Sequence, residues 1–131
     1  TSIFTKSPTS EQEKIYNLVL EAQKNAIKAL KPGKNCSSLY NVAFKTFKKE
    51  QLEEHFTHGL GHGLGREVHE LPSLSPKDTT RLKANMIVTI EPGLYLPGKF
   101  GIRIEDMVLI TPTGHKNLTS VQKGIKDCII R

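Results

Sequence analysis

Features that would mark a special class of protein are scarce in this sequence. The only two cysteines among 131 residues are Cys36 and Cys128, which form no CxxC pair, so neither a disulfide framework nor a thiolate metal site is predicted. No apolar run reaches the roughly 18 to 20 residues that span a bilayer, and the first residues lack the apolar core of a signal peptide. We therefore expect one globular domain in the cytoplasm, with no membrane partner.

Basic residues are plentiful, but they lack the pattern of a nucleic-acid-binding surface. The formal net charge is +6, from 19 Lys and Arg against 13 Asp and Glu. The lysines are spread along the chain, without an arginine-rich run and without interleaved aromatic residues. The sequence therefore favours a solvated basic face and predicts no nucleic-acid partner.

The first half of the chain has the spacing of two amphipathic helices. Ser10 and Glu13 match a capping box, which predicts that a helix begins there. Lys31-Pro32-Gly33 contains helix-ending residues, and a second helix is expected from about Ser37. The apolar residues at helical spacing that we expect in the core are Ile15, Leu18, Val19, Ala22, Ala26, Ala29, Leu30, Leu39, Val42, Ala43 and Phe47.

From His55 onward the sequence has the character of strands and turns. The segments 86–91 and 102–110 are rich in β-branched residues, and Pro97-Gly98 between them predicts a turn. Glycine at every second position from 59 to 65 disfavours a helix and predicts an extended chain with a bare glycine face, which another backbone or a ligand can approach closely. The residues predicted to share its other face are His58, Leu60, His62 and Leu64.

Three histidines and two glutamates are the candidates for chemistry. A single histidine such as His58, His62 or His69 is most often structural, but these three fall within twelve positions. Gly98 lies seven residues from both Glu91 and Glu105, so a hairpin about Pro97-Gly98 brings the two carboxylates opposite one another. Facing carboxylates repel unless a cation lies between them, and a divalent metal ion supplies that cation.

One imidazole and two carboxylates form a suitable ligand set for manganese, cobalt or zinc. Two such ions lower the pKa of a shared water and clamp the tetrahedral intermediate of peptide hydrolysis. The charges do not balance, however, because two divalent ions carry four positive charges and the two glutamates carry two negative ones. Asp78 and Asp106 have no evident partner pattern, so further carboxylates are expected from elsewhere.

Three ordered motifs resemble the C-terminal catalytic motifs of Xaa-Pro aminopeptidases and prolidases, dinuclear metallopeptidases of the pita-bread family. The similarity covers essentially the whole chain, and its motifs are residues 58–65 with 68–72, residues 90–98 and residues 101–106. It implies an α+β fold, the C-terminal half of the pita-bread fold, with two helices packed on a curved antiparallel sheet. It also implies hydrolysis of the bond between an N-terminal residue and proline, with two metal ions in the full enzyme, manganese foremost and cobalt or zinc as alternatives.

The resemblance also implies a role for each motif residue. His62, Glu91 and Glu105 would be metal ligands, and Glu91 would also act as general base toward the bridging water. His58 and His69 would line the substrate site, where His69 would hydrogen-bond the scissile region or the developing oxyanion. Arg103 would orient the carboxylates. The substrate would be a peptide with proline in its second position.

Two aspartate ligands that the family carries upstream of the first helix are absent from residues 1–131. We therefore expect these residues to form a partial catalytic domain, inactive alone and holding one metal ion or none. In an alternative, a separate chain supplies the aspartates. Independently of this, the open sheet edges left by missing strands favour pairing with another chain, so a homo-oligomer is also expected.

Two other functions were weighed against this interpretation. One is a non-catalytic pita-bread module that binds protein or nucleic acid, and the other is a methionine aminopeptidase. A binding module has no reason to keep so costly a set of polar residues as the three histidines, two glutamates and Arg103. The motifs at 91–98 and 101–106 look more like the proline-directed branch than like methionine aminopeptidases.

Overall fold

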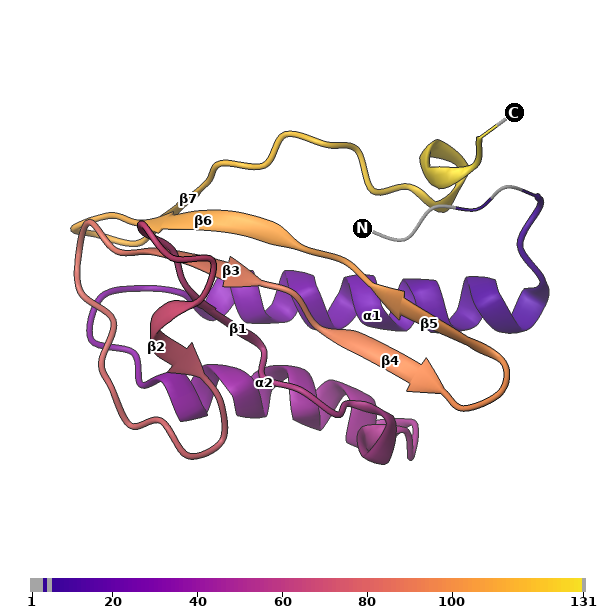
Figure 1. The fold of residues 1–131 in the computed structure, drawn as a ribbon, viewed down its shortest axis with the longest axis horizontal. Coiled ribbons are helices and arrows are strands. Elements are labelled where there is room, and N and C mark those ends of the chain that lie inside the picture. The colour runs from indigo at the N-terminus through magenta and orange to yellow at the C-terminus, as the bar shows by residue number, and fades with distance from the viewer. Residues whose placement is uncertain (1–3, 5, 131) are drawn as a thin grey trace.

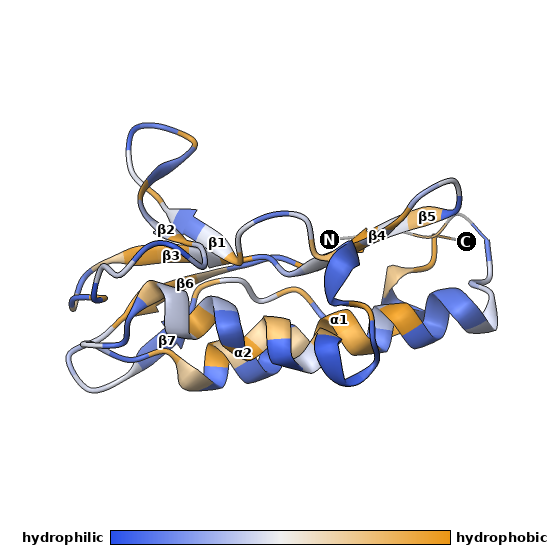
Figure 2. Cartoon of the chain, turned by 90° about the horizontal axis from the view of Figure 1, so that it is seen from below, coloured by the Kyte–Doolittle hydropathy of each residue, from blue (hydrophilic) through white to orange (hydrophobic). Residues whose placement is uncertain are grey.

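Two helices lie on one side of an antiparallel sheet (Figure 1, Figure 2). The computed structural model describes residue 4 and residues 6–130. The helices are α1 (Ser10–Ala29) and α2 (Cys36–Lys49), and the strands are β1 (Gly61–Gly63), β2 (Glu70–Leu74), β3 (Ile87–Ile90), β4 (Gly93–Leu96), β5 (Phe100–Arg103), β6 (Asp106–Ile110) and β7 (His115–Asn117). Short 3₁₀ turns occur at Glu53–His55 and Ile125–Cys128. None of the helices in these residues is long and apolar enough to cross a membrane.

The capping box of α1 lies one residue earlier than predicted. The hydroxyl of Thr9 accepts from the Gln12 amide at 3.2 Å, and the Thr9 amide donates to the Gln12 side-chain oxygen at 2.8 Å. The predicted pair of Ser10 and Glu13 is therefore wrong, because Thr9 and Gln12 supply the same reciprocal bonds one position upstream. Asn35 caps α2 by accepting from the amide of Ser37.

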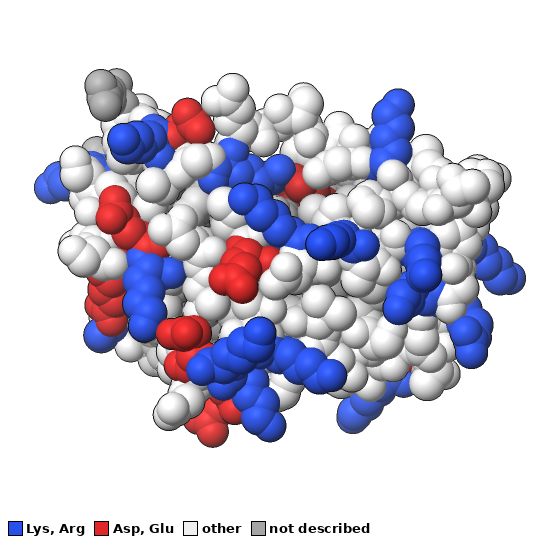
Figure 3. All heavy atoms as spheres, turned by 180° about the vertical axis from the view of Figure 1, so that it is seen from behind, with Lys and Arg blue, Asp and Glu red and all other residues white. Residues whose placement is uncertain are grey.

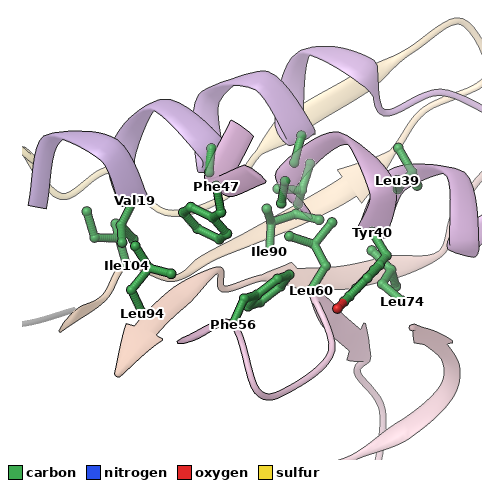
Figure 4. Packing of buried hydrophobic residues seen from close by; sticks show 14 of the residues in the cluster. Val19, Leu39, Tyr40, Phe47, Phe56, Leu60, Leu74, Ile90, Leu94 and Ile104 are labelled. Carbon is green, nitrogen blue, oxygen red and sulfur yellow. The ribbon is translucent and has the colours of Figure 1, made fainter. Parts of the chain in front are cut away.

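The core fills the layer between the helices and the sheet (Figure 4). Nine of the eleven residues predicted to face inward are buried, and Ala29 and Val42 are half-buried at the margin. Phe47 of α2 meets Phe56 edge to face, with ring centroids 5.2 Å apart. Burial of each large side chain contributes about 1.5–3 kcal/mol. Leu60 and Ile90 are fully buried, which anchors the chain directly before His62 and Glu91.

The predicted hairpin about Pro97-Gly98 is confirmed. The main sheet has the order β2-β1-β3-β6-β7, and β4 and β5 form a separate pair. Ile90 pairs with Asp106 at the end of the β3–β6 ladder, and Gly93 pairs with Arg103 at the start of the β4–β5 ladder. The two ladders continue in the same register, so Glu91 lies opposite Glu105 across the hairpin. The strand predicted at 102–110 is interrupted at 104–105, so the two glutamates lie where one sheet gives way to the other.

The strand β1 is shorter than the extended segment predicted for it. Leu60 is buried in the core, whereas His58 and His62 line a cavity, so the prediction of one face shared by His58, Leu60, His62 and Leu64 is wrong. The ladder with β2 starts only at Gly61, and the alternation of a strand does not extend upstream of it. The prediction of a close approach along the glycines is confirmed, since a Cβ at Gly61 would overlap the backbone carbonyl of Thr89.

The face opposite to the view of Figure 1 carries many basic side chains. Figure 3 shows them spread over that face with acidic side chains among them, rather than gathered in one stripe. Exposed ion pairs such as Lys14 with Glu50, at 3.2 Å, contribute little to stability.

Candidate active site

Five of the six predicted site residues line a single cavity of about 420 Å³, which is within the size range of small-ligand sites. They come from β1, from the segments beside it and from the interrupted hairpin. The loop that joins β1 to β2 carries His69 and projects from the sheet on the side away from the helices (Figure 2). The lining residues are His58, Gly59, Gly61, His62, His69, Glu70, Leu71, Ser73, Glu91 and Arg103.

His62 and Glu91 form the centre of this cavity. The Nε2 atom of His62 lies 3.2 Å from Oε1 of Glu91, and the side chains are 16% and 12% exposed. The Nδ1 atom of His62 lies 2.8 Å from the carbonyl oxygen of Gly63. A carbonyl only accepts, so Nδ1 carries a proton and donates to it, and Nε2 is the ring nitrogen that faces the carboxylate oxygen. A contact of this length is bridged either by a proton on Nε2 or by a metal cation.

His58 is held in a similar way. Its Nδ1 atom donates to the carbonyl of Gly59 at 2.7 Å, and its ring lies edge-on to Phe56 and Tyr95, at centroid distances of 5.3 and 5.4 Å. The Nε2 atom is buried and has no hydrogen-bond partner among the described residues. The ring of His58 is therefore fixed by its neighbours at the wall of the cavity.

His69 and Arg103 flank the central pair. The ring of His69 is exposed, and its centroid lies 4.4 Å from that of His62. The Nε atom of Arg103 lies 3.8 Å from Oε2 of Glu91, at a half-exposed position. The guanidinium thus faces the carboxylate oxygen that does not contact His62, and it holds the orientation of Glu91 electrostatically.

Glu105 is the predicted site residue that the structure does not bring into this cavity. It is half-buried and opposite Glu91 in register, but it is not among the lining residues. Within residue 4 and residues 6–130, no three His, Cys, Asp or Glu side chains are grouped closely enough to hold a metal ion. Two candidate metal ligands, His62 and Glu91, are in contact, and a third ligand would have to move toward them.

Asp78 and Asp106, for which the sequence showed no partner pattern, both make hydrogen bonds or ion pairs in the structure. Asp106 is buried and binds Lys123 Nζ at 2.8 Å and Asn117 Nδ2 at 2.7 Å. It faces a larger cavity, about 600 Å³, against α1, which contains none of the predicted site residues. Hydrogen bonds from Thr80, with a further one from the Ser73 amide, hold the pKa of Asp78 below its usual value despite partial burial. Both oxygens of Asp78 accept hydrogen bonds, whereas Oδ1 of Asp106 is buried without a hydrogen-bond partner among the described residues and does not line the cavity of His62 and Glu91.

Thr89 is the residue of this site that sequence reasoning missed. Its hydroxyl accepts from the His62 amide at 3.0 Å and donates to Oε1 of Glu91 at 2.9 Å. Its position two residues before Glu91 on a strand, and therefore on the same face, was the available signal.

The chain matches known peptidases over nearly all its length. A family model described as metallopeptidase family M24 matches residues 1–112. An Xaa-Pro dipeptidase of Pyrococcus furiosus is 47% identical over 124 residues, which cover 95% of this chain and 36% of that protein. An Xaa-Pro dipeptidase of Pyrococcus horikoshii is 45% identical, with 95% and 35% covered. The chain thus spans about a third of the length of these relatives.

Solved structures agree with this similarity. The prolidase from Pyrococcus horikoshii superposes with a TM-score of 0.91 at 45% identity, covering 94% of this chain and 35% of that one. An X-Pro aminopeptidase from Thermotoga maritima gives 0.88 at 40% identity, with 95% and 35% covered. The predicted α+β fold and the resemblance to part of a prolidase catalytic domain are confirmed.

Proposed function

Because this chain belongs to metallopeptidase family M24, we propose that it forms part of a two-metal peptidase that cleaves the bond between an N-terminal residue and proline. The observation that carries the proposal is the contact of 3.2 Å between His62 Nε2 and Glu91 Oε1, which brings two kinds of divalent-metal ligand, an imidazole nitrogen and a carboxylate oxygen, together in one cavity. The similarity to Xaa-Pro dipeptidases supports the substrate class.

The donor set fits divalent cations. We assign His62 and Glu91 as ligands, together with Glu105, which lies opposite Glu91 in the hairpin register. Manganese is the metal we propose, since oxygen donors outnumber nitrogen in this set. Bound divalent ions supply electrostatic stabilisation of the developing oxyanion and acidify water. Two divalent ions need more negative charge than Glu91 and Glu105 supply. We propose that the further carboxylates come from residues other than 1–131, either in a longer protein or in a second chain.

The remaining cavity residues act on the substrate and on protons. Glu91 is placed to accept a proton from the attacking water and to return it to the leaving proline nitrogen, which carries no proton of its own in the peptide. His69 is exposed at the rim and donates a hydrogen bond to the scissile carbonyl. His58 lines the substrate site as part of its wall. Arg103 keeps Glu91 in its orientation.

The cellular setting follows the sequence prediction. We propose a cytoplasmic enzyme, since Cys36 and Cys128 are both unpaired and buried, as suits a reducing compartment.

The test is an assay of the complete protein that contains this segment, loaded with Mn²⁺. We expect hydrolysis of Ala-Pro and of longer peptides with proline second, and none of Ala-Ala. His62→Ala and Glu91→Gln should abolish activity, with loss of at least about a thousandfold. His115→Ala is the matched control, because His115 lies outside the cavity and contacts the Leu30 carbonyl at 2.9 Å.

Two results would refute the assignment. Release of N-terminal methionine with Xaa-Pro peptides left intact would make the protein a methionine aminopeptidase. Salt-dependent association with nucleic acid that His62→Ala and Glu91→Gln leave unchanged, without hydrolysis of any peptide, would favour a binding module.

A further inference from the structure

Thr89 is the only described residue whose side chain bonds both members of the central pair. It lies on β3 and is 1% exposed. Its hydroxyl oxygen lies 3.0 Å from the amide nitrogen of His62 and 2.9 Å from Oε1 of Glu91. One buried hydroxyl therefore links β1, which carries the imidazole, to the carboxylate that follows β3.

The direction of these bonds is fixed by chemistry. The His62 amide can only donate, so the hydroxyl oxygen accepts from it. The single hydroxyl proton has two acceptors in reach, Oε1 of Glu91 at 2.9 Å and the His62 carbonyl at 3.5 Å. The shorter and charge-assisted bond takes the proton. Thr89 thus donates to the same carboxylate oxygen that faces Nε2 of His62.

The close approach of β1 to β3 makes this bridge fit. A Cβ at Gly61 would lie 2.7 Å from the Thr89 carbonyl carbon and 2.9 Å from its hydroxyl oxygen, inside van der Waals contact. The absence of a side chain at Gly61 therefore sets the distance at which the His62 amide meets the hydroxyl. The bridge belongs to the packing of the sheet and does not depend on a flexible loop.

We propose that Thr89 is a positioning residue, whose hydroxyl holds Oε1 of Glu91 against Nε2 of His62 and so sets the geometry in which the two receive a divalent cation. This role rests on the proposed function for its catalytic consequence, but the bridge itself is a property of the metal-free protein. Without the hydroxyl, the carboxylate turns toward Arg103, and its distance to the imidazole is no longer fixed.

The test compares variants in the complete protein. Thr89→Val removes the hydroxyl at constant shape, Thr89→Ser keeps it, and Thr89→Ala differs from the serine variant by the hydroxyl alone. Thr46→Val is the matched control, because Thr46 is also a buried threonine, but its hydroxyl donates to the Val42 carbonyl within α2. Three quantities are measured: Mn²⁺ affinity by calorimetry, kcat and KM on Ala-Pro, and hydrogen exchange of the His62 amide in metal-free protein.

We expect Thr89→Val and Thr89→Ala to bind Mn²⁺ about 10–100-fold more weakly, with a matching fall in kcat, little change in KM and faster exchange of the His62 amide. Thr89→Ser should stay within about threefold of wild type, as should Thr46→Val. If Thr89→Val does not fold, the serine and alanine pair still isolates the hydroxyl. Equal Mn²⁺ affinity in Thr89→Ser and Thr89→Ala would overturn the proposal, because it would leave packing as the only role. If the wild-type protein does not hydrolyse Xaa-Pro peptides but the variants still differ in Mn²⁺ affinity as expected, the proposed function is refuted and the positioning role of Thr89 is not.

Discussion

Replacement of Gly61 by alanine is the sharpest test of the close contact between β1 and β3. The new Cβ would overlap the Thr89 carbonyl, and its 2.7 Å distance to the carbonyl carbon cannot be relieved by a rotamer change, since both atoms belong to the backbone. The overlap is relieved only if the backbones of β1 and β3 move apart. Overpacking of this kind costs about 1–3 kcal/mol, and loss of the bond from the His62 amide leaves a buried donor unpaired at about 1–3 kcal/mol.

The lower entropy of the unfolded alanine chain offsets about 0.4–1 kcal/mol of this loss. The free energy of unfolding should therefore fall by about 1–6 kcal/mol, and Tm by roughly 3–5 °C for each kcal/mol in a chain of this size. Urea and thermal unfolding of metal-free protein, followed by circular dichroism, measure both quantities. The control is Gly114→Ala, since nothing lies within 4 Å of a Cβ there, and its effect should stay within about 0.5 kcal/mol. If the two variants unfold at the same urea concentration, the inferred strand contact is wrong.

Three further predictions concern acid stability, thiol chemistry and metal binding. The pKa of Asp78 is lower in the folded than in the unfolded protein, so the ionised carboxylate stabilises the fold above the unfolded-state pKa, and this stabilisation is lost as the pH falls. The difference in unfolding free energy between wild type and Asp78→Asn should therefore narrow below about pH 4. A difference that stays constant with pH would contradict this. Burial raises the pKa of the Cys36 thiol to about 11, so iodoacetamide at pH 8 should label it only after unfolding, and rapid labelling of the native protein would disprove the assignment. Calorimetric titration of residues 1–131 alone with Mn²⁺ should detect at most one weakly bound ion and no hydrolysis of Ala-Pro; tight binding of two ions would show that no outside carboxylate is needed.

The parts of the structure that local sequence determines were predictable. The turn at Pro97-Gly98 fixes the hairpin register, so the opposition of Glu91 and Glu105 could be derived from their spacing alone. Helical periodicity identified the buried faces because α1 and α2 each present one apolar stripe to the sheet.

The parts that depend on distant contacts were not predictable. The role of Thr89 arises only when β1 docks on β3, 27 residues away in sequence. Leu60 departs from strand alternation because the chain before Gly61 is irregular, and no periodic rule applies to it. The cap of α1 was displaced because two overlapping quartets match one motif, and only the backbone geometry selects Thr9.

The ion pair between Asp106 and Lys123 has a consequence for anyone who shortens this protein. Asp106 follows Glu105 directly, and its cation comes from a segment without helix or strand near the end of the chain. A version cut before Lys123 would leave the buried carboxylate of Asp106 without its cation, next to the proposed metal ligand Glu105. Loss of one partner of a buried ion pair costs about 3–5 kcal/mol. Lys123 is thus the counterion of a buried carboxylate next to Glu105, and a shortened version should keep the segment that carries it.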